Sequence, residues 1–132
     1  MFLKKSQSAM EFLILVAALF FFFILFFMAI QNNMRIKNYE ETNLLVKKTA
    51  YKIRDEINLA LEASEGYSRN FIIPQKIANK EYNASVNNSM IYLITYDRKH
   101  SIGISIRDIE GELQKGENTI EKKNGEVFLN DN

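Results

Sequence analysis

Few residues in this 132-residue chain have the type and spacing that catalysis would require. His100 is the only histidine, and it stands close to Asp97 and Ser101, so that the three groups of a nucleophilic triad lie together. Three groups within one short turn cannot hold one another in a catalytic orientation, because a triad needs supporting contacts from other elements. We therefore predict that this segment is a solvated turn.

Other catalytic and binding motifs are also missing from the sequence. Asp108 and Glu110 form a carboxylate pair, which we interpret as charges on a loop. There is no Gly-rich phosphate loop, metal-ligand spacing or nucleophile elbow, and no cysteine that could form a disulfide or bind a metal. A net charge of +1 gives no electrostatic basis for binding nucleic acid. We expect a protein that is not an enzyme, needs no cofactor and binds no nucleic acid.

Two N-x-S sequons are candidates for covalent modification. They are Asn83-Ala84-Ser85 and Asn87-Asn88-Ser89, and both lie near a predicted turn. Such sequons accept N-linked glycans only in an exported and exposed segment. Asn83 and Asn87 are therefore candidate glycosylation sites on an outer surface.

A carboxylate stands at the edge of a long apolar run. Phe12 to Ile30 is unbroken by polar residues and holds seven of the ten phenylalanines, and the next charge after Glu11 is Arg35. As a helix, this run would extend about 28 Å, close to the thickness of a bilayer core. An acidic group beside a membrane span is costly to bury and is a functional candidate, although a place among the lipid headgroups beside Lys4 would also explain Glu11.

A conventional secretory signal peptide explains this run less well. Its apolar region is shorter and ends in an A-x-A-like cleavage site, whereas the end of this run offers no pair of small residues. Basic residues flank both sides of the run, so their distribution does not determine orientation alone. The short N-terminal flank favours a single-pass span with a cytoplasmic N-terminus and the C-terminal domain outside the cell.

The residues around Glu11 resemble the class III signal peptide of archaeal type IV pilin-like proteins. The matching string is Lys4-Lys5-Ser6-Gln7-Ser8-Ala9-Met10-Glu11-Phe12-Leu13, in which a basic leader precedes a small residue, a glutamine, a glutamate and the apolar run. The common family form has serine where this chain has Ala9, and often glycine where it has Ser6. The resemblance covers about the first 30 residues tightly.

The resemblance implies cleavage by a membrane prepilin peptidase between Ser6 and Gln7, on the cytoplasmic side. Residues 1–6 would then be the leader, and the mature chain would carry a net charge of −1 after losing Lys4 and Lys5. The new amine of Gln7 would be buried in a bundle of neighbouring subunits' helices, where an unpaired charge is expensive. Glu11 of an adjacent subunit would supply the opposite charge, so that wrongly docked subunits would leave both charges unpaired.

An amphipathic helical pattern follows the run. The apolar positions Tyr39, Val46, Ala50, Ile53, Ile57 and Ala60 or Leu61 fall on one stripe, with charged residues between them. No proline interrupts the chain before Pro74, and Gly66 is a stop signal. We predict one helix from Gln7 to about Glu65, with a membrane segment over residues 7–33 and an amphipathic segment over 34–66. The stripe is expected to pack on the C-terminal sheet.

The remaining residues, 67–132, show strand-like patterns and predict an exported β-rich domain. The expected strands are 71–73, 82–86, 91–96, 101–106, 110–113, 118–121 and 126–129, with a hairpin at Asn124-Gly125. The predicted fold is α+β: a long N-terminal helix, whose first half spans the membrane, followed by a small antiparallel β-meander, as in pilins.

Two functions remain open from the sequence. The first is a structural subunit, a major or minor pilin, whose partners are the membrane, the peptidase and other pilin subunits along the N-terminal helix. It predicts localisation to the cell membrane and then to a filament surface. The second is a signal-anchored extracellular binding module that forms no filament, which leaves Glu11 unexplained.

Overall fold

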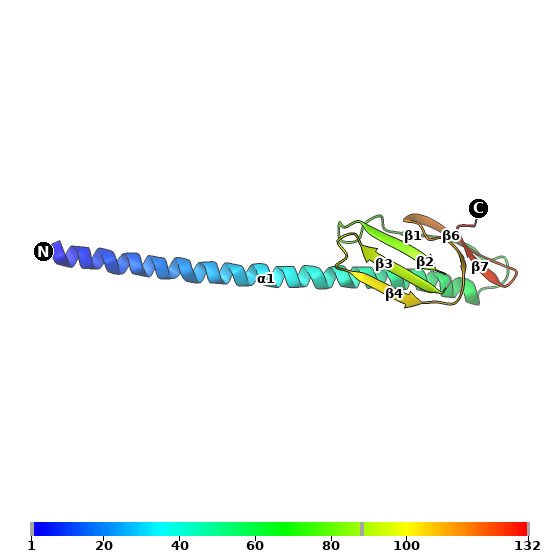
Figure 1. The fold of residues 1–132 in the computed structure, drawn as a ribbon, viewed down its shortest axis with the longest axis horizontal. Helices are drawn as coiled ribbons and strands as arrows, with labels where there is room; N and C mark the ends of the chain where they lie inside the picture. Colours follow the sequence, from blue (N-terminus) through cyan, green and yellow to red (C-terminus); the bar gives the residue numbers. More distant parts are fainter. Residues whose placement is uncertain (1, 88, 132) are drawn as a thin grey trace. The chain divides into compact units, whose positions relative to one another are not determined.

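A computed structural model describes residues 2–87 and 89–131 of the chain. Over these residues it contains one helix, α1 (Phe2–Glu62), followed by short strands (Figure 1). The predicted α+β class, with a long helix ahead of small antiparallel strands, is confirmed. The chain divides into two compact units, residues 1–39 and 40–132.

Helix α1 begins earlier and ends earlier than the sequence predicts. It starts at Phe2 rather than at Gln7, because Leu3, Lys4 and Lys5 are good helix formers with no proline or glycine among them. It ends at Glu62 rather than near Glu65. The Lys122 ammonium donates hydrogen bonds of 2.8 Å to the carbonyl oxygens of Leu61 and Ala63, which satisfies carbonyl groups at this end.

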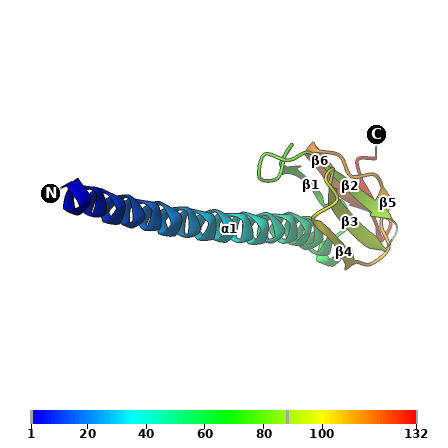
Figure 2. The ribbon, with the colours of Figure 1, turned by 60° about the vertical axis from the view of Figure 1, so that its left-hand side comes forward.

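The strands form two sheets, which Figure 2 shows from a second direction. The three-stranded sheet is an antiparallel meander in the order β2-β3-β4. The four-stranded sheet has the order β1-β6-β7-β5, and its β5–β7 pair is parallel. The strands are β1 (Ser68–Ile73), β2 (Tyr82–Asn87), β3 (Met90–Thr95), β4 (Ser101–Ser105), β5 (Glu110–Gly111), β6 (Gly116–Lys123) and β7 (Glu126–Leu129).

The hairpin predicted at Asn124-Gly125 is confirmed. It joins β6 to β7, with Lys123 opposite Glu126, and both central residues have positive φ, 53° and 79°. Two positive φ values are the geometry of the tight turn that asparagine and glycine favour.

The second unit has one hydrophobic core to which α1 and both sheets contribute. The predicted stripe residues from Val46 to Ala60 are 0–2% exposed, and Leu61 packs partly buried against them. Tyr39, the first predicted member, is 48% exposed and lies in the other unit. The expected packing of the stripe on the sheets is thus confirmed from Val46 onward. The core residues are Val46, Ala50, Ile53, Ile57, Ala60, Phe71, Ile73, Ile77, Tyr82, Ile91, Leu93, Ile109, Leu113, Ile120, Val127 and Leu129.

Candidate membrane and assembly site

The predicted cleavage position lies inside α1. Ser6 and Gln7 are both helical and exposed, and the Ser6 hydroxyl donates a 3.0 Å hydrogen bond to the carbonyl oxygen of Leu3. This bond to the preceding turn is the usual one for a serine within a helix. The side chains on both sides of the Ser6–Gln7 peptide bond are exposed.

Glu11 lies one helical turn beyond Gln7. Residues four apart project from the same face of a helix, so both belong to one exposed face of the first unit. A helix that docked on this face would contact Gln7 and the Glu11 carboxylate together. Gln7 and Glu11 are therefore neighbours because of the helix geometry alone.

The apolar run after Glu11 is uncovered. Its phenylalanine and leucine side chains are 46–67% exposed, and the 18-residue window of highest hydropathy in this helix reaches a mean of 3.2 with none of it buried. Some rings contact each other along the helix, as in the stacked pair Phe23 and Phe27, whose centroids are 6.3 Å apart. So large an apolar surface is unfavourable in water. By length and composition, α1 is a candidate membrane span.

The two candidate glycosylation sites both lie on β2. Asn83 is exposed and pairs across the strands with Ile94. Asn87 is exposed at the end of β2 and pairs with Met90. The middle residue of its sequon, Asn88, lies outside the described residues.

The prediction that His100 lies in a solvated turn is wrong. Its side chain is 1% exposed, and its ring nitrogen Nδ1 lies 2.5 Å from the Asn43 amide oxygen on α1. The tip of the turn is exposed as expected, but His100 precedes β4 in the same alternation as Ile102, which points inward. That alternation is the signal by which the sequence could have placed His100 inside.

Asp97, the acid of the suspected triad, is held by hydrogen bonds from residues of its own turn and from Lys80. Asp97 accepts hydrogen bonds from the Thr95 hydroxyl at 2.6 Å, the Lys99 backbone N–H at 3.0 Å and the Lys80 ammonium at 3.0 Å. These bonds, led by the Thr95 hydroxyl, hold the pKa of Asp97 well below its ordinary value. Burial lowers the pKa of His100, which favours its neutral form. The Asp97 carboxylate therefore organises the turn that leads into β4.

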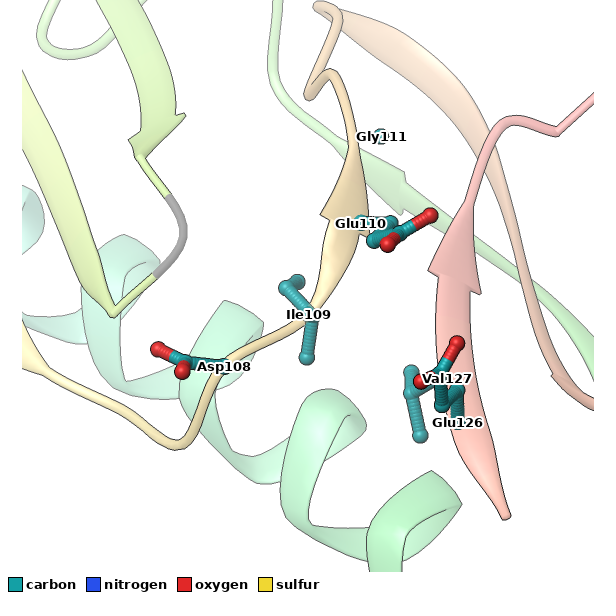
Figure 3. Close-up of a pocket in the computed structure, with 6 residues that line it drawn as sticks. All are labelled: Asp108, Ile109, Glu110, Gly111, Glu126 and Val127. Atoms are coloured by element: carbon teal, nitrogen blue, oxygen red, sulfur yellow. The ribbon is translucent and has the colours of Figure 1, made fainter.

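A shallow acidic pocket of about 470 Å³ lies beside β5 and β7 (Figure 3). Asp108, Glu110 and Glu126 line it together with Ile109, Gly111 and Val127. The carboxylate pair noted in the sequence is exposed, with Asp108 on a loop and Glu110 in β5. Over the described residues, no group of three His, Cys, Asp or Glu side chains is placed to hold a metal ion.

The chain is thus an α+β protein with a candidate membrane span near its N-terminus. No protein-family model matches it, and neither does any curated protein or solved structure.

Proposed function

We propose that this protein is a structural subunit of an archaeal type IV pilus-like filament, released from the membrane into the filament after prepilin peptidase removes residues 1–6. The observation that carries the proposal is the spacing of Ser6, Gln7 and Glu11 ahead of an uncovered apolar helix. A permanent membrane anchor needs the apolar run but not the glutamine, the glutamate or their separation.

The apolar side chains of the helix can be covered in either of two environments. Lipid covers it in the membrane, and the helices of neighbouring subunits cover it in a filament. The second environment excludes water and lipid headgroups, so the free amine of Gln7 needs an acidic partner there. Removing one member of a buried ion pair costs roughly 3–5 kcal/mol, which is enough to decide whether a subunit is incorporated.

The first test is mass spectrometry of the N-terminus of the native membrane or filament protein. A mature chain that starts at Gln7 supports processing by the peptidase. An intact leader refutes the pilin proposal and leaves the signal-anchored binding module as the better account.

The second test separates assembly from processing. Glu11→Gln keeps the size of the side chain and removes its charge, so we expect a strong loss of filaments while the mature protein accumulates in the membrane. Glu41→Gln is the matched control, because it removes an exposed acid from the second unit's part of the same helix. Normal filaments from Glu11→Gln would contradict the proposed ion pair. A processed wild-type protein that stays monomeric would contradict filament assembly itself.

A further inference from the structure

The outward side of the three-stranded sheet is an uncharged surface, although a quarter of the chain's residues are charged. The strand register places three residues of each strand on this side, and none buries its side chain fully. We call this surface the neutral face. Its members are Asn83, Ser85, Asn87, Met90, Tyr92, Ile94, Ser101, Gly103 and Ser105.

Two large side chains stand at the centre of the neutral face. Tyr92 is 46% exposed and Ile94 is 37% exposed, both on the middle strand β3. Tyr92 is flanked by Ser85 on one side and by Gly103 on the other. A Cβ atom at Gly103 would lie 3.3 Å from the ring atom Cε1 of Tyr92, so the glycine leaves room for the ring to lie against β4. The result is an apolar centre with small polar neighbours.

Asn83 projects from this same surface. It is directly opposite Ile94, and Tyr92 is its diagonal neighbour on β3. Directly opposed side chains are about 5 Å apart and diagonal ones roughly 7–8 Å. A sugar attached to the Asn83 amide would therefore be held beside Ile94 and within reach of the Tyr92 ring.

We propose that Asn83 carries an N-linked glycan whose first sugars lie over Ile94 and Tyr92, and that the neutral face is the platform for this glycan. The proposal rests on the proposed function to the extent that the second unit must be exported. The donor would be a sugar chain linked to a lipid through a phosphate or pyrophosphate, and the host's membrane glycosyltransferase would catalyse the transfer.

The transfer replaces one bond at the sugar by another. The Asn83 amide nitrogen forms a bond to the anomeric carbon, while the bond from that carbon to the lipid-bound phosphate oxygen breaks. The amide loses one proton to a base of the transferase, and the phosphate leaves with the lipid. No electron transfer is involved.

The chemistry of the face matches a tethered sugar. Sugar C–H groups carry a slight positive charge and favour the negative face of an aromatic ring, and serine and asparagine side chains hydrogen-bond to hydroxyl groups. Covalent attachment holds the sugar at a high effective concentration, so weak contacts suffice. A charged partner would bind this surface weakly, because the neutral face offers no opposite charge.

The test uses the full chain, produced in a host that N-glycosylates exported proteins and then solubilised in detergent. Intact-mass and peptide measurements report, on one sample, whether residues 1–6 are gone and whether Asn83 carries sugar. Ser85→Ala and Asn83→Gln each destroy the sequon, whereas Ser85→Thr keeps it. Asn87→Gln removes the neighbouring sequon only.

Nitration of tyrosine by tetranitromethane then measures coverage of the ring. We expect Tyr92 to react several-fold more slowly in the wild type, Ser85→Thr and Asn87→Gln than in Ser85→Ala and Asn83→Gln. Tyr51, which is 42% exposed on α1, is the internal control and should react equally in all of them.

Three results would overturn the proposal. The first is an exported chain that starts at Gln7 and has no sugar on Asn83, a result that leaves the pilin proposal intact. The second is a glycosylated Asn83 with Tyr92 nitrated as fast as in Asn83→Gln. The third is Tyr92 protected equally without the sugar, which would indicate another occupant such as a second copy of the chain. A chain that is neither cleaved nor exported would refute both proposals.

Discussion

Replacing Ile53 by alanine tests whether the apolar stripe of α1 belongs to the core of the second unit. Ile53 is fully buried among residues of the helix and both sheets. The substitution removes three carbon atoms, each worth about 0.8 kcal/mol when buried, or about 2.4 kcal/mol in total. Because the rigid helix cannot collapse fully into the space, a cavity cost is added, and we expect a loss of roughly 3–5 kcal/mol.

Leu59→Ala is the matched control on the same helix. Leu59 is 48% exposed, so its truncation should cost less than about 1 kcal/mol. The assay is guanidinium unfolding of the full chain in detergent, followed by near-ultraviolet circular dichroism of the tyrosines. This signal reports tertiary packing of the second unit, which contains five of the six tyrosines.

A difference of less than about 1 kcal/mol between the two variants would refute the packing argument, because buried and half-exposed truncations differ by more than this. A loss of filaments from Ile53→Ala without a loss of stability would instead indicate that the stripe contacts neighbouring subunits.

Three further changes test single contacts in the second unit. The pKa of His100 is lowered in the folded chain, so acidification below 6.5 protonates this ring in the unfolded chain first. Stability should therefore fall as the pH drops from 7.5 to 5, with a slope of at most about 1.4 kcal/mol per pH unit. His100→Gln should flatten this slope in denaturation measured across that range. Gly111→Ala should cost more than about 3 kcal/mol in the same assay, because its Cβ would lie 1.9 Å from the Leu129 carbonyl oxygen. Gly125→Ala is the control: its Cβ would have no neighbouring atom within 4 Å, so it should cost about 1 kcal/mol. Lys122→Met should cost about 1–2 kcal/mol, because it leaves helix-end carbonyls unpaired, and a loss below 0.3 kcal/mol would contradict this.

Local patterns explain why much of the fold could be predicted. The stripe from Val46 to Ala60 repeats with the period of a helix, and the strand segments alternate or are rich in β-branched residues. Asn124-Gly125 specifies its own turn geometry, which is independent of the rest of the chain. These features depend on residues within a few positions of one another.

Pairing between distant strands could not be predicted in this way. Ser68 of β1 pairs with Glu121 of β6, and β5 joins β7 in parallel, so the four-stranded sheet is not a simple meander. The sequence of a strand does not identify the strand with which it pairs, because many apolar strands fit a half-buried sheet equally well. The contact between His100 and Asn43 was missed for the same reason, since it joins residues 57 positions apart.

The candidate sites show the same difference between local patterns and long-range contacts. Ser6–Gln7 and the sequon at Asn83 are short strings of neighbouring residues, so they can be identified in the sequence without the fold. The effect that each string would have depends on the fold. In the proposed filament, the Glu11 charge would matter where another helix covers it. A sugar on Asn83 would lie near Ile94 and Tyr92 because the register places Ile94 opposite and Tyr92 diagonally. If β2 were shifted by one residue, Asn83 would turn toward the core and the sequon could not be used after folding. The register of β2 on β3 is therefore the structural feature on which the glycan proposal depends most directly.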